Sequence, residues 1–196
     1  MFVKVCGLRT PSDVAVAVAA GADAVGFVFA RSPRQVGVAE ARELAGQVSD
    51  GVVTVGVFKD IDAAEAAEMT AAAGLDMIQL HGDYPHAAFD QLSGKRLIRA
   101  TAHTPDTDVH TGAWGEEMLL LDSPAAGSGE RWDLSTLDTE PTGRWLLAGG
   151  LDPDNVADAV RAARPWGVDV SSGVESARGV KDPELIRRFL AAVRAL

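Results

Sequence analysis

Two stretches in the last third of the chain decide the fold: Trp145-Leu146-Leu147-Ala148-Gly149-Gly150 and Val168-Asp169-Val170-Ser171-Ser172-Gly173-Val174-Glu175. Each is an apolar run that ends at small residues, which let backbone N–H groups approach a ligand closely. A helix that begins nearby adds unsatisfied N–H groups and the positive end of its dipole. Two such ends side by side form a phosphate site, and in parallel β/α barrels this site follows the seventh and eighth strands. If these are strands seven and eight, six strands must precede them.

Six earlier apolar runs are present, and they alternate with helical segments without a linker or a low-complexity tract. Near-continuous apolar character is typical of parallel strands that are buried on both faces. The eight expected strands are residues 3–6, 24–29, 52–58, 77–80, 96–100, 118–121, 145–148 and 168–170.

The segments between the strands carry helix signals. Apolar residues recur at the spacing of a buried helix face, as in Ile186, Phe189, Leu190 and Val193. Three segments begin with an N-cap residue before a proline at the first helical position. These pairs are Thr10-Pro11, Asp152-Pro153 and Asp182-Pro183. Residues 21–25 and 74–78, which each start with a glycine typical of a helix end, indicate one helix-to-strand joint used twice.

The fold class follows from this alternation. Eight strand–helix units in 196 residues leave about 24 residues for each, the lower limit for a (β/α)8 barrel. A doubly wound open sheet is the alternative, but the paired phosphate loops and the absence of G-x-G-x-x-G after the first strand favour the barrel. Residues 101–116 are rich in Thr, Pro, Asp and His. We therefore predict one (β/α)8 TIM-barrel domain over residues 1–196, with the fifth helix short or absent.

The composition limits the class of ligand and the compartment. A net charge of −10 argues against nucleic acid and anionic membranes as partners. No apolar run approaches the ~20 residues of a membrane span, and the first residues read as a strand rather than a signal peptide. The single cysteine excludes an internal disulfide framework, so we expect a cytoplasmic protein. A phosphate ligand must then be attracted by local donors and a few arginines.

Polar residues gather at the expected carboxyl ends of the strands, where barrel enzymes carry their catalytic groups. The candidates are Cys6, Arg34, Gln79, His81, Asp122 and Asp169. No second His or acidic residue stands at ligand spacing from His81, so no metal site is expected.

Each candidate also has a structural interpretation. Cys6 is equally well a small buried hydrophobe, and Asp122 a turn or cap residue. Asp169 is compatible with a bond to loop backbone. His81 fits a turn or a pocket wall, and Arg34 a solvated loop. Their joint position at one barrel mouth is what favours function.

The strand ends belong to longer motifs in a fixed order. They are Lys4-Val5-Cys6-Gly7, Gly21-Ala22-Asp23-Ala24-Val25-Gly26-Phe27-Val28-Phe29, Ser32-Pro33-Arg34, Val55-Gly56-Val57-Phe58, Ile78-Gln79-Leu80-His81-Gly82, Leu120-Leu121-Asp122, Gly127-Ser128-Gly129, Leu147-Ala148-Gly149-Gly150-Leu151 and Val168–Glu175. Over the whole chain this series resembles phosphoribosylanthranilate isomerase of tryptophan biosynthesis. The glycine pairs are shared with many phosphate-binding barrels.

The resemblance implies an Amadori rearrangement that needs no metal or organic cofactor. N-(5-phosphoribosyl)anthranilate, an aminoaldose, becomes 1-(o-carboxyphenylamino)-1-deoxyribulose 5-phosphate. The resemblance gives Asp122 the role of general acid on the furanose ring oxygen, and Cys6 that of general base for the C2′ proton. A cysteine is a useful base only as thiolate, which nearby positive charge or donors favour.

The resemblance also implies the binding residues for a small phosphosugar substrate. Arg34 would face the anthranilate end, and Asp169 the sugar hydroxyls or the amine. The phosphate would be held by Gly149, Gly150, Ser172 and Gly173. The remaining substrate contacts would come from Gln79, His81, Gly127, Ser128 and Gly129. The expected assembly is a monomer or a homodimer.

Two departures from the family and three rival functions are considered. The loop after Asp122 is short, and Ala126 stands where the family usually has the first of two glycines. Both features predict that residues 123–131 move less than a full-length lid would. The histidine-pathway aminoaldose isomerase has an aspartate in place of Cys6 and two phosphate-binding halves. Indole-glycerol-phosphate synthase needs a lysine at a strand end, which Lys4 is not. A catalytically silent phosphosugar-binding barrel is the third rival, and the joint presence of Cys6 and Asp122 disfavours it.

Overall fold

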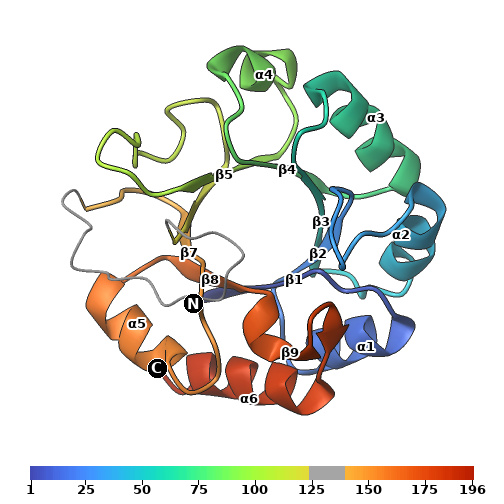
Figure 1. The fold of residues 1–196 in the computed structure, drawn as a ribbon, viewed down its shortest axis with the longest axis vertical. Coiled ribbons are helices and arrows are strands. Elements are labelled where there is room, and N and C mark those ends of the chain that lie inside the picture. Colours follow the sequence, from blue (N-terminus) through green and yellow to red (C-terminus); the bar gives the residue numbers. More distant parts are fainter. Residues whose placement is uncertain (124–139) are drawn as a thin grey trace.

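The computed structural model describes residues 1–123 and 140–196 and has eight parallel strands in a closed barrel, in sequence order (Figure 1). Every expected strand is confirmed, with ends that differ by at most two residues. The strands are β1 (Phe2–Cys6), β2 (Ala24–Val28), β3 (Val53–Phe58), β4 (Met77–His81), β5 (Leu97–Ala102), β6 (Met118–Asp122), β7 (Trp145–Leu147) and β8 (Gly167–Val170).

Helices cover the outside of the barrel. They are α1 (Pro11–Ala19), α2 (Val38–Ala45), α3 (Ala63–Ala73), α4 (His86–Gln91), α5 (Val156–Ala163) and α6 (Pro183–Arg194). Residues 103–117, between β5 and β6, contain no helix, as predicted from their composition. A 3-10 helix (Ser172–Val174) and a short hairpin, β9 (Glu175–Ala177) with β10 (Val180–Lys181), follow β8. None of the helices in the described ranges is both long and apolar enough to cross a bilayer.

Two of the three predicted proline caps are confirmed. Thr10 accepts a hydrogen bond from the N–H of Asp13, and Asp182 caps α6. The third prediction is wrong, because α5 begins at Val156 rather than at residue 153. The Asp152 carboxylate instead accepts two backbone N–H groups of a turn, and the Asn155 side chain donates to the Gly150 carbonyl. These bonds hold residues 153–155 as a turn and delay the helix.

The two glycine-marked joints are the same structure, as predicted. In the first, Asp23 exchanges two bonds with the backbone of Val3, accepting at 2.8 Å and donating at 2.9 Å. In the second, Asp76 does the same with the backbone of Thr54, at 2.8 and 3.0 Å. Each aspartate therefore locks the start of one strand to the start of its neighbour.

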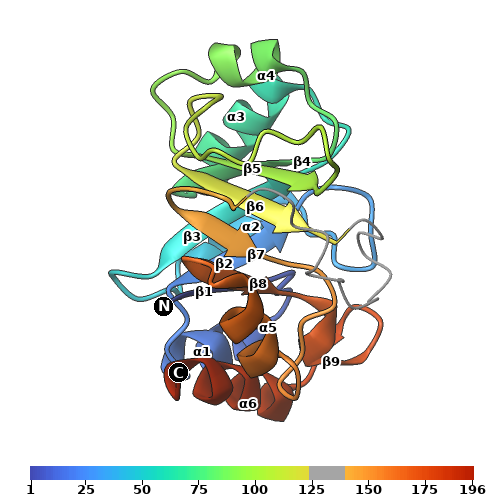
Figure 2. The ribbon, with the colours of Figure 1, turned by 90° about the vertical axis from the view of Figure 1, so that its left-hand side faces the viewer.

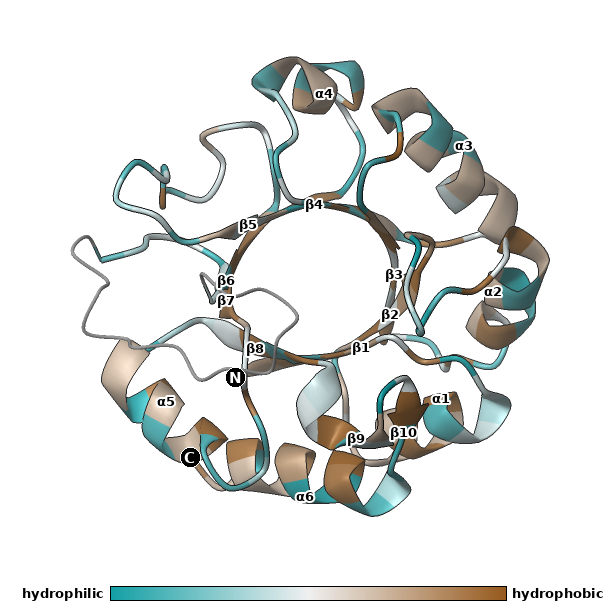
Figure 3. Ribbon diagram, viewed as in Figure 1, coloured by the Kyte–Doolittle hydropathy of each residue, from teal (hydrophilic) through white to brown (hydrophobic). Residues whose placement is uncertain are grey.

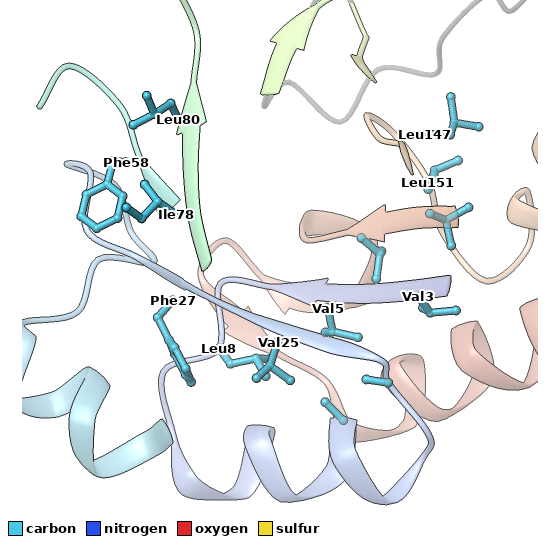
Figure 4. Close-up of a cluster of buried hydrophobic side chains, with 14 of the residues drawn as sticks. Val3, Val5, Leu8, Val25, Phe27, Phe58, Ile78, Leu80, Leu147 and Leu151 are labelled. Atoms are coloured by element: carbon cyan, nitrogen blue, oxygen red, sulfur yellow. The ribbon is translucent and has the colours of Figure 1, made fainter. Parts of the chain in front are cut away.

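Side chains alternate between two cores because successive residues of a strand point to opposite faces. The outer core lies between the strands and the helices, and Figure 4 shows Leu8 and Val25 between the first strands and the helix that follows β1. The wall strands are mostly apolar, whereas the helices mix apolar and polar residues (Figure 3). The inner core fills the barrel with alanine, branched aliphatic side chains such as Val55 and Ile98, and methionines such as Met77.

The carboxyl ends of the strands meet at one end of the barrel. In Figure 2 the arrowheads of β4, β6 and β7 point to the side where β9 lies, and both termini lie at the opposite end. The β9–β10 hairpin therefore stands on the face where the predicted site residues emerge.

Candidate active site

The interior of the barrel carries a buried ion pair that the sequence analysis did not assign to the site. The Nζ of Lys4 lies 2.7 Å from Oδ1 of Asp169, and Lys4 is fully buried. The two residues are direct register partners on β1 and β8, where the barrel closes. Lys4 stands two residues before Cys6 on the same strand, so both side chains point inward. This spacing of two residues between Lys4 and Cys6 is the feature of the sequence from which Lys4 could have been assigned to the site.

Gly26 makes room for the cysteine and the lysine together. It is the register partner of Cys6 on β2. A Cβ at this position would lie 2.9 Å from Sγ of Cys6 and 3.3 Å from Nζ of Lys4. The thiol and the ammonium therefore approach the same point of the neighbouring strand, and any side chain there would displace one of them.

The ionisation of Cys6 is set by opposing influences. Burial raises the pKa of the thiol, and Asp169 raises it further. Lys4 and Lys181 lower it, but the pKa stays above its usual value. In Lys4 itself, burial lowers the pKa, while Asp169 and Cys6 raise it, with a net increase. Cys6 is thus a thiol at rest at neutral pH, with a permanent ammonium group beside it.

Asp122 stands at the carboxyl end of β6, as predicted, and has a strongly perturbed carboxyl group. Burial raises its pKa to about 6, Asp169 adds to that shift, and the N–H of Ser123 opposes it. That N–H donates to Oδ1 at 2.8 Å. Nε2 of His81, at the end of β4, lies 3.8 Å from Oδ2, beyond a hydrogen bond. Burial lowers the pKa of His81, so a neutral imidazole faces a carboxyl group that titrates near neutrality.

Gly149 lets the end of β7 press against this acid. Its φ is +87°, and a Cβ there would lie 2.5 Å from Oδ1 of Asp122 and 2.6 Å from the Ser123 nitrogen. Gly150 also has a positive φ, +65°. A Cβ at Gly173 would collide with the carbonyl of Leu151, so the loops after β7 and β8 are in direct contact.

Six of the ten predicted site residues that the structure describes line one cavity. It is lined by Arg34, Asp122, Gly149, Gly150, Asp169 and Ser172, together with Ala148, Leu151, Val170 and Ser171. Cys6 does not line this cavity, but Asp169, which does, raises the pKa of its thiol, and Lys4 contacts Asp169. Gln79 is buried inside the barrel, and its Oε1 has no hydrogen-bond partner among the described residues. Gly127, Ser128 and Gly129 lie outside the described residues.

Arg34 differs from the expectation in one respect, because its guanidinium is already paired. Nε and Nη2 donate to the two carboxylate oxygens of Glu175, at 2.6 and 2.9 Å. Nζ of Lys181 lies 2.8 Å from the same carboxylate. Burial alone would raise the pKa of Glu175, but the bonds from Arg34 and Lys181 lower it to about 2. From the sequence, no role was predicted for Glu175, which stands in the motif after β8, or for Lys181.

Comparisons with known proteins identify the family. The family model described as N-(5′-phosphoribosyl)anthranilate (PRA) isomerase matches residues 3–192. A curated N-(5′-phosphoribosyl)anthranilate isomerase from Methylibium petroleiphilum is 44% identical, over 98% of this chain and 93% of its own. The crystal structure of TrpF from Jonesia denitrificans has 47% identity and a TM-score of 0.92, covering 100% of this chain and 97% of its own.

A further similar structure was solved with a bound ligand. It is a phosphoribosyl anthranilate isomerase in complex with reduced 1-(o-carboxyphenylamino)-1-deoxyribulose 5-phosphate, with 30% identity, a TM-score of 0.83 and full coverage of both chains. One assignment follows from the family match over nearly the whole sequence and from the closed barrel. The positions of Cys6, Asp122 and the glycine loops are consistent with it. This chain belongs to the N-(5′-phosphoribosyl)anthranilate isomerase family.

Proposed function

We propose that this chain converts N-(5′-phosphoribosyl)anthranilate to 1-(o-carboxyphenylamino)-1-deoxyribulose 5-phosphate, with Asp122 as general acid and Cys6 as general base. The observation that carries the proposal is the placement of a carboxyl group with a pKa of about 6 on the same cavity as the glycine loops. A carboxyl group with this pKa still holds a transferable proton near neutral pH.

The first step opens the sugar. Asp122 gives its proton to the furanose ring oxygen, the bond between that oxygen and C1′ breaks, and the nitrogen lone pair forms an iminium at C1′. The N–H of Ser123 holds the carboxyl group in place. The burial that raises the pKa of Asp122 also makes its ionised form costly, which favours recovery of the proton at the end of the cycle.

The second step moves the double bond. Cys6 takes the C2′ proton, and the C–H electron pair forms an enolamine while the iminium nitrogen becomes neutral. The enolamine then gains a proton at C1′ and loses the proton of its C2′ hydroxyl, which gives the ketone. The iminium, being cationic, lowers the pKa of the C2′ proton. Lys4 stabilises the thiolate that must form, since it lowers the pKa of the thiol more than Lys181 does.

Binding is divided between the two sides of the cavity. In this proposal, backbone N–H groups of Gly149, Gly150, Ser172 and Gly173 hold the phosphate, which neutral donors can do in a protein of net charge −10. Arg34 faces the ring carboxylate. Gln79, His81 and Asp169 remain for the sugar, and the unpartnered Oε1 of Gln79 supports such a contact.

The test is turnover by the purified chain. Phosphoribosylanthranilate is fluorescent, so its loss measures the reaction directly, and Cys6→Ala should lower kcat by ~10²–10⁴ with little change in product-analogue affinity. A silent binding barrel would bind the reduced product analogue without converting substrate. Conversion of the histidine-pathway aminoaldose in preference to phosphoribosylanthranilate would support the other isomerase.

A further inference from the structure

Glu175 takes no part in the chemistry above, yet it binds Arg34 with both carboxylate oxygens. The ion pair is shielded from water, because the Glu175 side chain is 4% exposed and that of Arg34 is 16% exposed. A bidentate pair of this kind fixes the plane of the guanidinium as well as its position. Arg34 is therefore held before any ligand arrives.

Glu175 is itself anchored from the β9–β10 hairpin. The N–H of Gly179 donates to Oε2 at 2.9 Å, and Nζ of Lys181 donates to Oε1 at 2.8 Å. Lys181 also donates to the carbonyl of Ser171 at 2.8 Å. Because these bonds and Arg34 lower the pKa of Glu175 to about 2, the carboxylate stays ionised across the neutral range.

Two glycines allow close packing around Arg34, one against its side chain and one against the backbone of the preceding Pro33. A Cβ at Gly7 would lie 2.7 Å from Cδ of Arg34, and a Cβ at Gly179 would lie 2.8 Å from the carbonyl of Pro33. Both glycines have a positive φ, +78° and +82°. The arginine thus runs between the end of β1 and the hairpin, close against both.

The pairing with Glu175 leaves one edge of the guanidinium open. A guanidinium has five N–H donors in one plane, and the side-on edge made by Nε and Nη2 is the one that Glu175 occupies. No hydrogen bond from Nη1 occurs within residues 1–123 and 140–196, and Arg34 lines the cavity beside Gly149 and Asp169. A second carboxylate can therefore bind end-on while Glu175 stays in place.

We propose that Glu175 is a specificity-determining positioning residue, which holds Arg34 side-on so that the end-on edge of its guanidinium meets the ring carboxylate of the substrate. This inference rests on the proposed function. Gly179 and Lys181 hold Glu175 in turn, so the hairpin after the phosphate loop contributes to recognition of the opposite end of the same ligand.

The experiment measures selectivity for that carboxylate. Two ligands are titrated by calorimetry: reduced 1-(o-carboxyphenylamino)-1-deoxyribulose 5-phosphate and the matching phenylamino compound without the carboxylate. Glu175→Gln should lower the affinity for the first ligand roughly 3- to 10-fold, which is what the loss of one pre-ordered long side chain costs in binding. The affinity for the second ligand should change less than about twofold. With Arg34→Met already present, Glu175→Gln should change neither, since it acts through Arg34.

The controls separate this role from a loss of fold. Glu43→Gln removes the same charge from an exposed position on α2 and should leave both affinities unchanged. If Glu175→Gln does not fold by circular dichroism, Glu175→Asp keeps the charge beside Lys181 and shortens the reach to Arg34, and it must show the same selective loss.

Three results would overturn the proposal: equal weakening of both ligands, an undiminished effect in the Arg34→Met background, or tighter binding of the carboxylate ligand, which would make Glu175 a competitor. Binding of the carboxylate ligand without turnover by the wild-type chain would refute the proposed activity and leave this test intact. Binding of neither ligand would overturn both.

Discussion

The carboxylate of Asp169, on the last strand of the barrel, lies 2.7 Å from the ammonium of Lys4 on the first. The pair crosses the seam where β8 meets β1, and it stands directly beneath the cavity that Asp169 lines. A fully buried lysine is tolerated here because its charge is paired and hydrogen-bonded. The same ammonium lowers the pKa of the Cys6 thiol. Lys4 therefore both stabilises the closure of the barrel and lowers the pKa of the proposed base, Cys6.

Lys4→Met should cost about 3–5 kcal/mol of the free energy of unfolding, because it leaves the Asp169 carboxylate buried without its partner. Asp169→Asn should cost a similar amount, and the double variant less than the sum of the two. Urea unfolding measures all three. Additive effects would show that the ion pair contributes no coupling across the seam.

The pH dependence of kcat/KM should be bell-shaped with the usual assignment reversed. The acid, Asp122, has a pKa of about 6, whereas the pKa of the base, Cys6, is raised above 9.0. The productive form keeps the proton on Asp122 while Cys6 is ionised. Activity should therefore rise with pH up to about 6, stay nearly level while loss of the Asp122 proton offsets the ionisation of Cys6, and fall once Cys6 is ionised, with a small productive fraction throughout. The limbs belong to the coupled site rather than to either group alone.

The charged groups around the pair are known, which makes the assignment testable. Lys4, Asp169 and Lys181 act on Cys6, while Asp169, Lys59 and His81 face Asp122. Alkylation of Cys6 by iodoacetamide should accelerate only at alkaline pH, and Lys4→Met should move that rise to still higher pH. An alkylation midpoint near pH 6 would contradict the reversed assignment.

Asp122→Asn should lower kcat by ~10²–10⁴ and stabilise the fold at neutral and alkaline pH. The folded pKa of about 6 lies above the ordinary value of 3.8. Below about pH 4 Asp122 holds its proton in both the folded and the unfolded chain, so its contribution to the free energy of unfolding is intact. That contribution is lost as the pH rises toward and through 6, and the full loss is about 3 kcal/mol at most.

The measurement is urea unfolding of both proteins at pH 4 and pH 8. The stability advantage of Asp122→Asn should appear at pH 8 and vanish at pH 4. An advantage of equal size at both pH values would mean that ionisation of Asp122 is not its cause, and destabilisation at both would assign the carboxyl group a purely structural role.

Gly149→Ala should damage both stability and catalysis. An alanine at φ +87° costs ~1 kcal/mol or more, and its Cβ would press on Asp122 and Ser123. Gly74→Ala is the matched control, since it has a φ of +69° with nothing within 4 Å of the added Cβ. Gly74→Ala should lose a comparable part of the free energy of unfolding and keep the wild-type kcat. Equal kcat values for the two variants would show that Gly149 does not affect catalysis by Asp122.

The sequence by itself determined the eight strands, their order and the barrel. Apolar runs, helical spacing and the Gly-Asp joints are local signals, and each is written within a few neighbouring residues. The absence of a helix after β5 could also be predicted, because residues 103–117 lack the apolar periodicity that a helix needs. The delayed start of α5 could not be predicted, since hydrogen bonds of the Asp152 and Asn155 side chains outweigh the helix-start signal of the proline.

The site residues could be predicted by type and strand end, but their partners could not. Lys4 meets Asp169 across 165 positions, and Arg34 meets Glu175 across 141. Closure of the barrel creates both contacts, and burial then decides which groups hold protons, so the raised pKa values of Asp122 and Cys6 exist only in the folded chain. The sequence determines which chemical groups are present, and the tertiary structure determines their protonation states and the directions in which they point.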